Sequence, residues 1–126
     1  MIWNLFATDI IFKLDIPNAL KERFIEYWSN RGEKKFNVTY SMELPYLQYI
    51  HSKNWYKNFF SSAPTITKIE VLNKKQCTKK SCLLWMALYK QNYQEPIYLY
   101  DKWLKINGMW YHKYDDSILP IFTGKE

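Results

Sequence analysis

The sequence is poor in the residues that loosen a chain. It contains three glycines and five prolines among 126 residues, which argues against a loop-rich or low-complexity protein. Hydrophobic residues make up 48% of the chain and aromatic residues 19%. A chain of this composition can bury a core and is not expected to be disordered. Its length favours one domain, so we predict a single domain over residues 1–126.

Arginine is also scarce, because only two of the eighteen basic residues are arginine. The formal net charge of +6 therefore comes from lysine. A basic chain can attract nucleic acid or an anionic membrane, but bidentate recognition of phosphates and bases depends on arginine. We expect a solvated, lysine-rich surface and no nucleic-acid partner. No run approaches the roughly 20 apolar residues of a membrane-spanning helix, so we expect no transmembrane segment.

Cysteine and histidine are each present only twice. Cys77 and Cys82 lie on the two sides of a predicted turn, where either a disulfide or a pair of reduced thiols is possible. A disulfide, with an export signal removed, would indicate a periplasmic or exported protein, and reduced thiols a cytoplasmic one. His51 and His112 show no metal-ligand spacing with these cysteines. We therefore expect no metal site and no cofactor.

Apolar residues recur at three- and four-residue steps in the first half of the chain, which is typical of amphipathic helices. In the first helix, Asp15 is a candidate N-cap, Pro17 suits the first turn, and Gly32 is placed to end the helix. Pro45 ends or kinks the second helix, and residues 46–50 fit either a helical turn or an extended piece. The predicted helices cover residues 16–30, residues 33–44 and a short segment with Ser52 as its N-cap.

The second half of the chain has the patterns of strands. Residues 65–74 alternate, which predicts a half-buried strand with Thr67, Ile69 and Val71 on one side. Residues 82–89 are apolar on both faces, which predicts a central strand covered on both sides. Helices followed by strands indicate an α+β architecture. The remaining predicted strands are residues 97–106, residues 109–114 and an edge segment at residues 118–122.

The Asn107-Gly108 pair predicts a two-residue hairpin turn, since both positions of such a turn need a positive φ. The turn places Trp103 opposite His112 and Asp101 opposite Tyr114, with Cβ atoms about 4.5–5.5 Å apart. Side chains alternate along a strand, so one face of the hairpin collects Asp101, Trp103, Lys105, Trp110, His112 and Tyr114. The other face is more apolar and is the alternative inner wall; it holds Tyr100, Leu104, Ile106, Met109 and Tyr111.

This hairpin resembles a motif of a known superfamily. The run from Asp101 to His112, DKWLKINGMWYH, looks like the D-x-W-x-K-x-x-G-x-W-Y hairpin of small, uncharacterised bacterial members of the nuclear transport factor 2-like (cystatin-like) superfamily. The order of helices and strands is similar over nearly the whole chain. The resemblance implies N-terminal helices packed in the concave face of a strongly curved, mostly antiparallel sheet, with a cavity at the open end of the cone. Members of the superfamily include enzymes and binding domains, so the fold leaves the function open.

The leading functional hypothesis is a non-enzymatic binding domain. It would hold a small apolar ligand or a protein partner through an aromatic cavity or a sheet face, and it could form a homodimer. Glu43 and neighbouring tyrosines are predicted to line the mouth of the cone, with core packing of these tyrosines as the alternative. The candidate ligand-binding residues are Tyr40, Tyr46, Tyr49, Trp85, Trp103 and Trp110.

The alternative hypothesis is an isomerase- or dehydratase-like enzyme. Asp101 would be the acid of the cavity, and His112 and Tyr114 would be proton donors next to a carbonyl substrate. This chemistry requires the three side chains to converge in a pocket that excludes water. A solvent-facing ladder, in which Asp101 pairs with a tyrosine or a lysine, is the structural interpretation of the same pattern.

Overall fold

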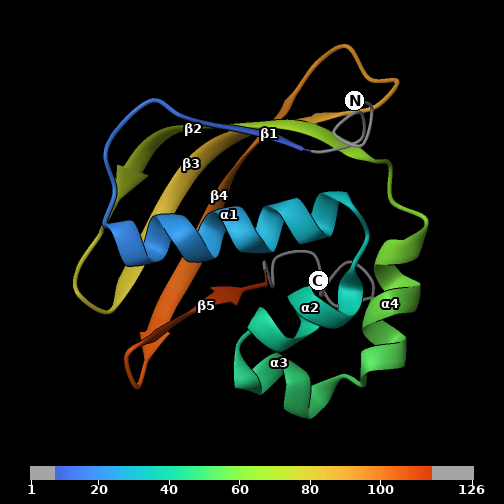
Figure 1. Cartoon of the computed structure of the whole chain (residues 1–126), viewed down its shortest axis with the longest axis horizontal. Helices are drawn as coiled ribbons and strands as arrows, with labels where there is room; N and C mark the ends of the chain where they lie inside the picture. The colour runs from blue at the N-terminus through green and yellow to red at the C-terminus, as the bar shows by residue number, and fades with distance from the viewer. Residues whose placement is uncertain (1–7, 115–126) are drawn as a thin grey trace, which may run out of the picture.

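The computed structural model describes residues 8–114 and shows an α+β fold, a five-stranded mixed sheet with four helices. The strands lie in the order β1-β2-β3-β4-β5, with β1 parallel to β2 and all other neighbours antiparallel. Helix α1 crosses one face of the sheet, and helices α2, α3 and α4 are grouped near the C-terminal end of α1 (Figure 1). The elements are β1 (Asp9–Phe12), α1 (Asn18–Gly32), α2 (Phe36–Met42), α3 (Pro45–Ile50), α4 (Lys53–Ser61), β2 (Ile66–Lys75), β3 (Ser81–Lys90), β4 (Ile97–Ile106) and β5 (Met109–Lys113).

Helix α1 supplies the main apolar stripe against the sheet. Its buried positions recur at helical spacing, as the sequence predicts. The helix starts later than predicted, because its N-cap is Pro17, and the expected capping role of Asp15 is wrong. Pro17 offers no side-chain acceptor, but its carbonyl accepts the Lys21 N–H at 2.9 Å. The buried residues of this helix are Leu20, Phe24, Tyr27, Trp28 and Gly32.

The segment after α1 forms three short helices instead of one longer helix. Lys34 has a φ of 61°, which a right-handed helix does not allow, so α2 begins only at Phe36. Pro45 occupies the first turn of α3, and residues 46–50 are therefore helical. The predicted N-cap of α4 is confirmed, since Ser52 Oγ accepts the Trp55 N–H at 3.1 Å.

The predicted hairpin of β4 and β5 is confirmed in its register. Asn107 and Gly108 have φ values of 51° and 81°, and Trp103 lies opposite His112. The ladder ends at the pair Lys102–Lys113, one residue short of the expected Asp101–Tyr114 pair. The face that carries Asp101 and His112 points inward, as their burial shows.

The alternative inner wall of the hairpin points outward. Its outermost side chains are largely exposed, including Tyr100 at 42% and Met109 at 45%. No described helix covers this side, so β3 is not covered on both faces as predicted (Figure 1). The apolar side chains there cover one another instead: Trp85 stacks with Tyr98 at 6.1 Å between ring centroids. A central strand can thus be apolar on both faces without a second layer.

Two features of β2 depart from the sequence pattern. A register shift between Ile66 and Lys68 turns Ile66 inward and leaves Thr67 exposed, because a bulge changes the alternation of side chains. The parallel neighbour β1 was not predicted, and Lys13 N–H extends its pairing to the Val71 carbonyl at 2.9 Å. The residues of β1 are few and lack a clear alternation.

The sheet is twisted but not strongly curled, which corrects the expectation of a cone (Figure 1). Bulges bend a strand most sharply, and among the described strands the register shifts are confined to the β2–β3 pair. The other strand pairs are regular, so the sheet does not close into a cone. The helices therefore lie against a face of the sheet and not inside a closed roll. The predicted edge strand at residues 118–122 lies outside the described residues. No described helix has both the length and the apolar character needed to cross a membrane.

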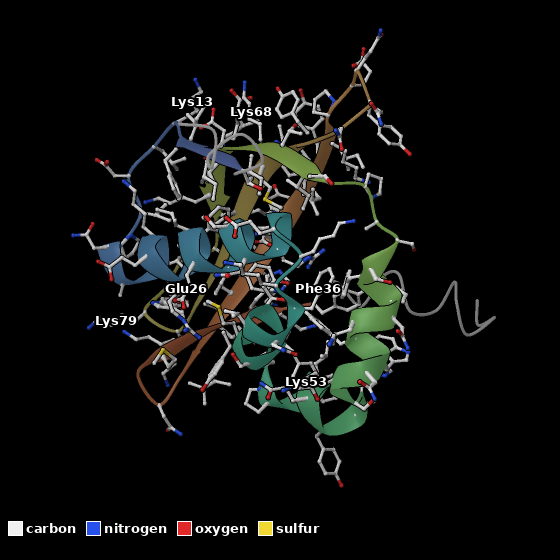
Figure 2. All side chains as sticks on the ribbon, turned by 45° about the vertical axis from the view of Figure 1, so that its right-hand side comes forward. Lys13, Glu26, Phe36, Lys53, Lys68 and Lys79 are labelled. Atoms are coloured by element: carbon white, nitrogen blue, oxygen red, sulfur yellow. A yellow bond between two sulfur atoms is a disulfide. The ribbon has the colours of Figure 1, made fainter. Side chains whose placement is uncertain are left out.

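The lysines are spread over the outside of the molecule. Figure 2 labels Lys13, Lys53 and Lys79, which project from well-separated parts of the chain and are exposed. These positions fit the expectation of a solvated basic surface.

Candidate functional site

A polar cluster lies in the interior between the helices and the β4–β5 hairpin. His112 of β5 sits between two carboxylates, with its Nδ1 atom 2.8 Å from Glu43 Oε1 and its Nε2 atom 2.8 Å from Asp101 Oδ1. Glu43 is 0% exposed, Asp101 3% and His112 4%. The cluster is therefore shielded from water on a fold that otherwise buries apolar side chains.

Two local features bring these residues together. Asp101 and His112 share the inner face of the hairpin because of its register. Glu43 follows the last turn of α2 in an extended conformation and forms a β-bridge with His112. The next residue, Leu44, donates its backbone N–H to the His112 carbonyl at 3.0 Å. The end of α2 is thereby fixed to the sheet at the point where the two carboxylates meet the imidazole.

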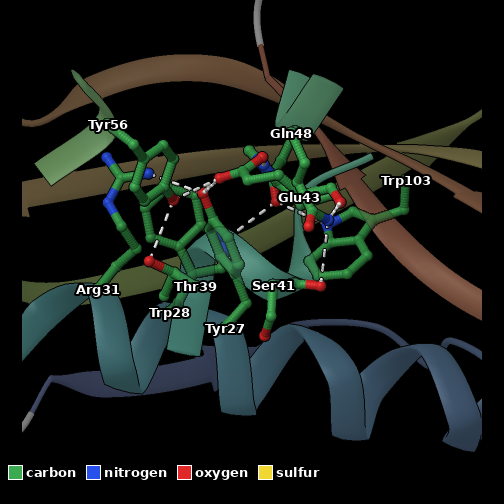
Figure 3. Close-up of polar contacts among 11 residues, drawn as sticks. Tyr27, Trp28, Arg31, Thr39, Ser41, Glu43, Gln48, Tyr56 and Trp103 are labelled. Carbon is green, nitrogen blue, oxygen red and sulfur yellow. Dashed lines mark hydrogen bonds and ion pairs between the residues drawn. The ribbon is translucent and has the colours of Figure 1, made fainter. Parts of the chain in front are cut away.

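The second oxygen of Glu43 accepts hydrogen bonds from two tyrosines (Figure 3). The Tyr27 hydroxyl lies 2.5 Å and the Tyr56 hydroxyl 2.6 Å from Glu43 Oε2. Tyr56 also contacts Thr39 Oγ1 at 3.0 Å. Arg31 Nη1 donates to the Tyr27 hydroxyl at 2.7 Å. Glu43 is thus connected through Tyr27 to the guanidinium of Arg31.

The second oxygen of Asp101 is held by two indoles. Trp28 Nε1 donates to Asp101 Oδ2 at 2.9 Å, and Trp103 Nε1 donates to the same atom at 2.8 Å. The ring of Tyr27 stacks on His112, with 4.2 Å between centroids and 21° between planes. Every carboxylate oxygen and both imidazole nitrogens in the cluster therefore have a partner inside the protein.

The two carboxylates keep His112 protonated. Each ring nitrogen faces a carboxylate oxygen, which is an acceptor, so both nitrogens act as donors in the imidazolium form. Burial by itself lowers the pKa of His112, but the charges of Glu43 and Asp101 outweigh burial and raise this pKa to about 9. Burial also raises the pKa of Tyr27 well above its ordinary value. At neutral pH the cluster therefore contains a charged histidine and an un-ionised Tyr27.

A cavity of about 360 Å³ adjoins the cluster. Its volume falls within the size range of small-molecule sites. Asp101 and His112 border it together with Trp28 and Arg31 of α1. The rest of the wall is mostly apolar and includes Phe59, Phe60, Ala63, Pro64, Ile66, Leu88, Ile97 and Leu99.

The structure brings together two of the three candidate catalytic residues. Asp101 and His112 are hydrogen-bonded and border the cavity. Tyr114 borders the same cavity, but its ring belongs to a second apolar cluster, 5.6 Å from the ring of Phe60. The hydrogen bonds of Asp101 go to His112 and to indole N–H groups, where we expected the Tyr114 hydroxyl.

The six candidate ligand-binding residues lie outside the wall of this cavity. Trp103 is fully buried beside Asp101, and Trp110 is buried in the main core. Trp85 lies on the outer face of the sheet and borders a second pocket there. The Tyr40 hydroxyl donates to the backbone carbonyls of Gln48 and His51.

The other two tyrosines face solvent on α3. Tyr46 is 59% exposed and Tyr49 is 91% exposed. They were expected at the mouth of a cone together with Glu43, which instead is fully buried at the centre of the cluster. The hydrogen bonds of Arg31, Thr39 and Tyr56 to the cluster were not predicted. In the sequence these residues show only helical spacing, which does not distinguish an apolar core position from a hydrogen-bonded one.

The two cysteines take no part in the hydrogen bonds of the cluster, although Cys82 lies opposite Trp103 in the sheet. Cys77 and Cys82 are joined by a disulfide across the turn between β2 and β3. Within the described residues 8–114, no group of three His, Cys, Asp or Glu side chains is arranged to hold a metal ion.

Comparisons with known proteins identify a shared fold and no family. No family model and no curated protein match the chain. The crystal structure of a SEC-C motif containing protein from Psychrobacter arcticus has a TM-score of 0.61 and 12% identity, covering 81% of this chain and 63% of that one. The chain thus spans less than two thirds of that protein. The solution structure of a SEC-C motif containing protein from Rhodopseudomonas palustris has a TM-score of 0.56 and 9% identity, covering 73% of each chain. At these identities the similarity concerns the α+β fold alone.

Proposed function

We propose that this chain is a non-enzymatic binding domain that holds a small apolar ligand in the cavity beside His112. The observation that carries the proposal is the cavity itself, about 360 Å³ with a mostly apolar wall. The resemblance of the terminal hairpin to the nuclear transport factor 2-like superfamily also supports it, because binding domains occur in that superfamily.

The state of the polar cluster supports binding over catalysis. A general acid or base must reach a proton of the substrate. Here both ring nitrogens of His112 are hydrogen-bonded to carboxylate oxygens. The second oxygen of each carboxylate accepts hydrogen bonds from tyrosine hydroxyls or from tryptophan N–H groups. A substrate would have to displace one of these buried partners, which leaves an unsatisfied polar group. The cluster therefore serves to shape one end of the cavity.

A neutral fluorescent probe tests the proposal. N-phenyl-1-naphthylamine brightens in apolar sites, so it should bind the protein with a stoichiometry near one. Leu99→Trp would fill part of the cavity, since Leu99 lies in its wall, and should weaken binding of the probe. Leu104→Trp is the matched control on the same strand, because Leu104 points to the outer face opposite Tyr111. Absence of binding, or equal loss in both variants, would contradict the proposal.

An isomerase- or dehydratase-like enzyme is the second candidate, favoured by the position of Asp101 and His112 at the cavity. Such a site would exchange protons next to the carbonyl of a ketone that enters the cavity. Incubation with cyclic and aromatic ketones in deuterium oxide, followed by NMR, would reveal this exchange. Exchange that is lost in folded His112→Gln would favour the enzyme, and no exchange above buffer favours the binding domain.

A further inference from the structure

We propose that the ligand of this cavity carries a carboxylate, which binds the guanidinium of Arg31 while the apolar body lies along the cavity wall. The inference rests on the proposed function and deepens it, because it assigns a chemical class to the ligand. The class is an amphipathic monocarboxylic acid.

Arg31 is held in a fixed orientation at the cavity. It lies in the last turn of α1 and belongs to the cavity wall. Its Nη1 atom donates to the Tyr27 hydroxyl at 2.7 Å. The centre of its guanidinium lies 4.1 Å from the Phe60 ring centroid and 5.1 Å from that of Trp28. These contacts limit the rotamers of a long side chain, so little further ordering is needed when a ligand binds.

The charge of Arg31 has no direct counter-ion in the described part of the chain. Among residues 8–114, none of the ion pairs involves Arg31, and its hydrogen bond goes to a phenol. A guanidinium has five N–H donors, and the side chain of Arg31 is only partly buried at the cavity wall. The charge of Glu43 acts on Arg31 across the cluster, but the two side chains share no direct hydrogen bond and are linked through the Tyr27 hydroxyl (Figure 3). This leaves donors of Arg31 for an acceptor supplied by a ligand.

The other charged groups of the wall favour an anion. Lys90 borders the cavity and has the same sign as Arg31. The one carboxylate of the wall, Asp101, is engaged by the His112 imidazolium and by two indoles. Because Asp101 is already engaged, the charges of Arg31 and Lys90 favour an anionic head group in the cavity.

The shape of the site indicates a carboxylate in particular. A planar guanidinium pairs with a carboxylate through two parallel N–H···O bonds. Phe60 lies against the guanidinium, and neither it nor the wall residues Leu88 and Leu99 offers a donor to a larger polar head. A single carboxylate on an apolar body therefore matches both parts of the wall.

A set of three ten-carbon ligands tests this proposal at pH 7.5. Decanoate, decanol and decylamine share one apolar body and differ in the charge of the head. Their affinities can be measured by displacement of N-phenyl-1-naphthylamine and by calorimetry. We expect decanoate to bind roughly ten- to a hundredfold more tightly than decanol, as for a hydrogen bond to a charged group, and decylamine to bind most weakly.

Substitutions of Arg31 and Arg23 show which residue causes the preference for decanoate. Arg31→Gln should abolish the preference for decanoate and leave the affinity for decanol unchanged, whereas Arg31→Lys should keep part of the preference. Arg23→Gln is the matched control on α1, because Arg23 bonds the Trp110 carbonyl and is not part of the cavity wall. Thermal unfolding of each variant shows whether it is folded.

The outcomes separate this inference from the proposed function. Equal binding of decanol and decanoate to the wild-type protein overturns the inference and leaves the binding function standing. A decanoate preference that persists in Arg31→Gln, or that is lost equally in Arg23→Gln, also overturns it. If neither the probe nor any ten-carbon ligand binds, the proposed function fails as well. Should Arg31→Gln not fold, the wild-type comparison and Arg31→Lys decide.

Discussion

His112 and its two carboxylates form a set of buried charges that depend on one another. The imidazolium is favourable in the interior only because Glu43 and Asp101 face its two nitrogens. Removing one member leaves the others without compensation, and such a change is far more destabilising than the loss of an exposed pair. The cluster should therefore dominate both the pH dependence and the mutational sensitivity of the fold.

The stability of the protein should fall as the pH rises above about 6.5. The folded-state pKa of His112 is about 9, and the pKa of an unfolded histidine is about 6.5. A raised pKa gives stability that is complete below the unfolded value and is lost as the pH passes through the folded value. The difference corresponds to roughly 3 kcal/mol of unfolding free energy.

Urea unfolding between pH 6 and pH 9.5 measures this loss. His51→Gln is the control, because it removes the other histidine of the chain and leaves Glu43, Asp101 and His112 in place, so its profile should follow that of the wild-type protein. The ring nitrogens of His112 can also be followed by NMR, which should report the charged form at pH 7. A neutral ring at that pH would show that the carboxylates do not outweigh burial.

Glu43→Gln should be strongly destabilising although it preserves the size of the side chain. It removes one of the two charges that face His112 and brings amide hydrogens toward the donor hydroxyls of Tyr27 and Tyr56. The expected loss is about 3–5 kcal/mol of unfolding free energy, with a lower pKa for His112. The measurement is chemical denaturation of the variant beside Glu22→Gln, an exposed position on α1. A loss from Glu43→Gln no larger than that control would show that the charge of Glu43 is not needed.

At the scale of elements, the close approach of β1 to the end of α1 depends on Gly32. A Cβ atom there would lie 1.8 Å from Thr8 Oγ1, the hydroxyl that donates to the Ile66 carbonyl at 2.9 Å. Gly32→Ala should therefore displace β1 and lower the unfolding free energy by about 1–3 kcal/mol. In a Thr8→Gly background the same substitution should be much less harmful. An equal loss in both backgrounds would place the clash elsewhere.

A substitution at Gly108, in the Asn-Gly turn between β4 and β5, would measure the cost of backbone strain without any steric clash of the side chain. A Cβ atom on Gly108 would meet nothing within 4 Å, but the φ of this residue is +81°. Gly108→Ala should thus cost about 1–2 kcal/mol from the left-handed backbone alone. Thermal and chemical unfolding give this value, and a loss near zero would indicate that the turn can relax to another type.

At the scale of the whole molecule, the disulfide between Cys77 and Cys82 restrains the junction of β2 and β3. It closes a short loop, with a sequence separation of 5, so its effect on the unfolded chain is modest. Loop-closure entropy predicts a stabilisation of roughly 2 kcal/mol. Unfolding curves with and without reductant should differ by this amount, and Cys77→Ala/Cys82→Ala should show no response to reductant. Identical curves for the reduced and oxidised wild-type protein would contradict the prediction.

The order and type of the main elements could be predicted from local pattern. Alternation identified β2, the run of apolar residues identified β3, and Asn107-Gly108 set the β4–β5 register. Local chemistry also located the N-cap of α4 at Ser52. The errors arose where contacts across the fold decide, as in the bulge beside Thr67, the parallel pairing of β1 and the modest curvature of the sheet.

The sequence by itself determined the hairpin register, and with it the fact that Asp101 and His112 share a face. Only the tertiary structure decided that this more polar face points inward, because the partners that make its burial favourable come from distant segments: Glu43 after α2 and the indole of Trp28 on α1. A hydrophobic pattern ranks faces by apolar content and cannot count hydrogen bonds that form only after the chain has folded.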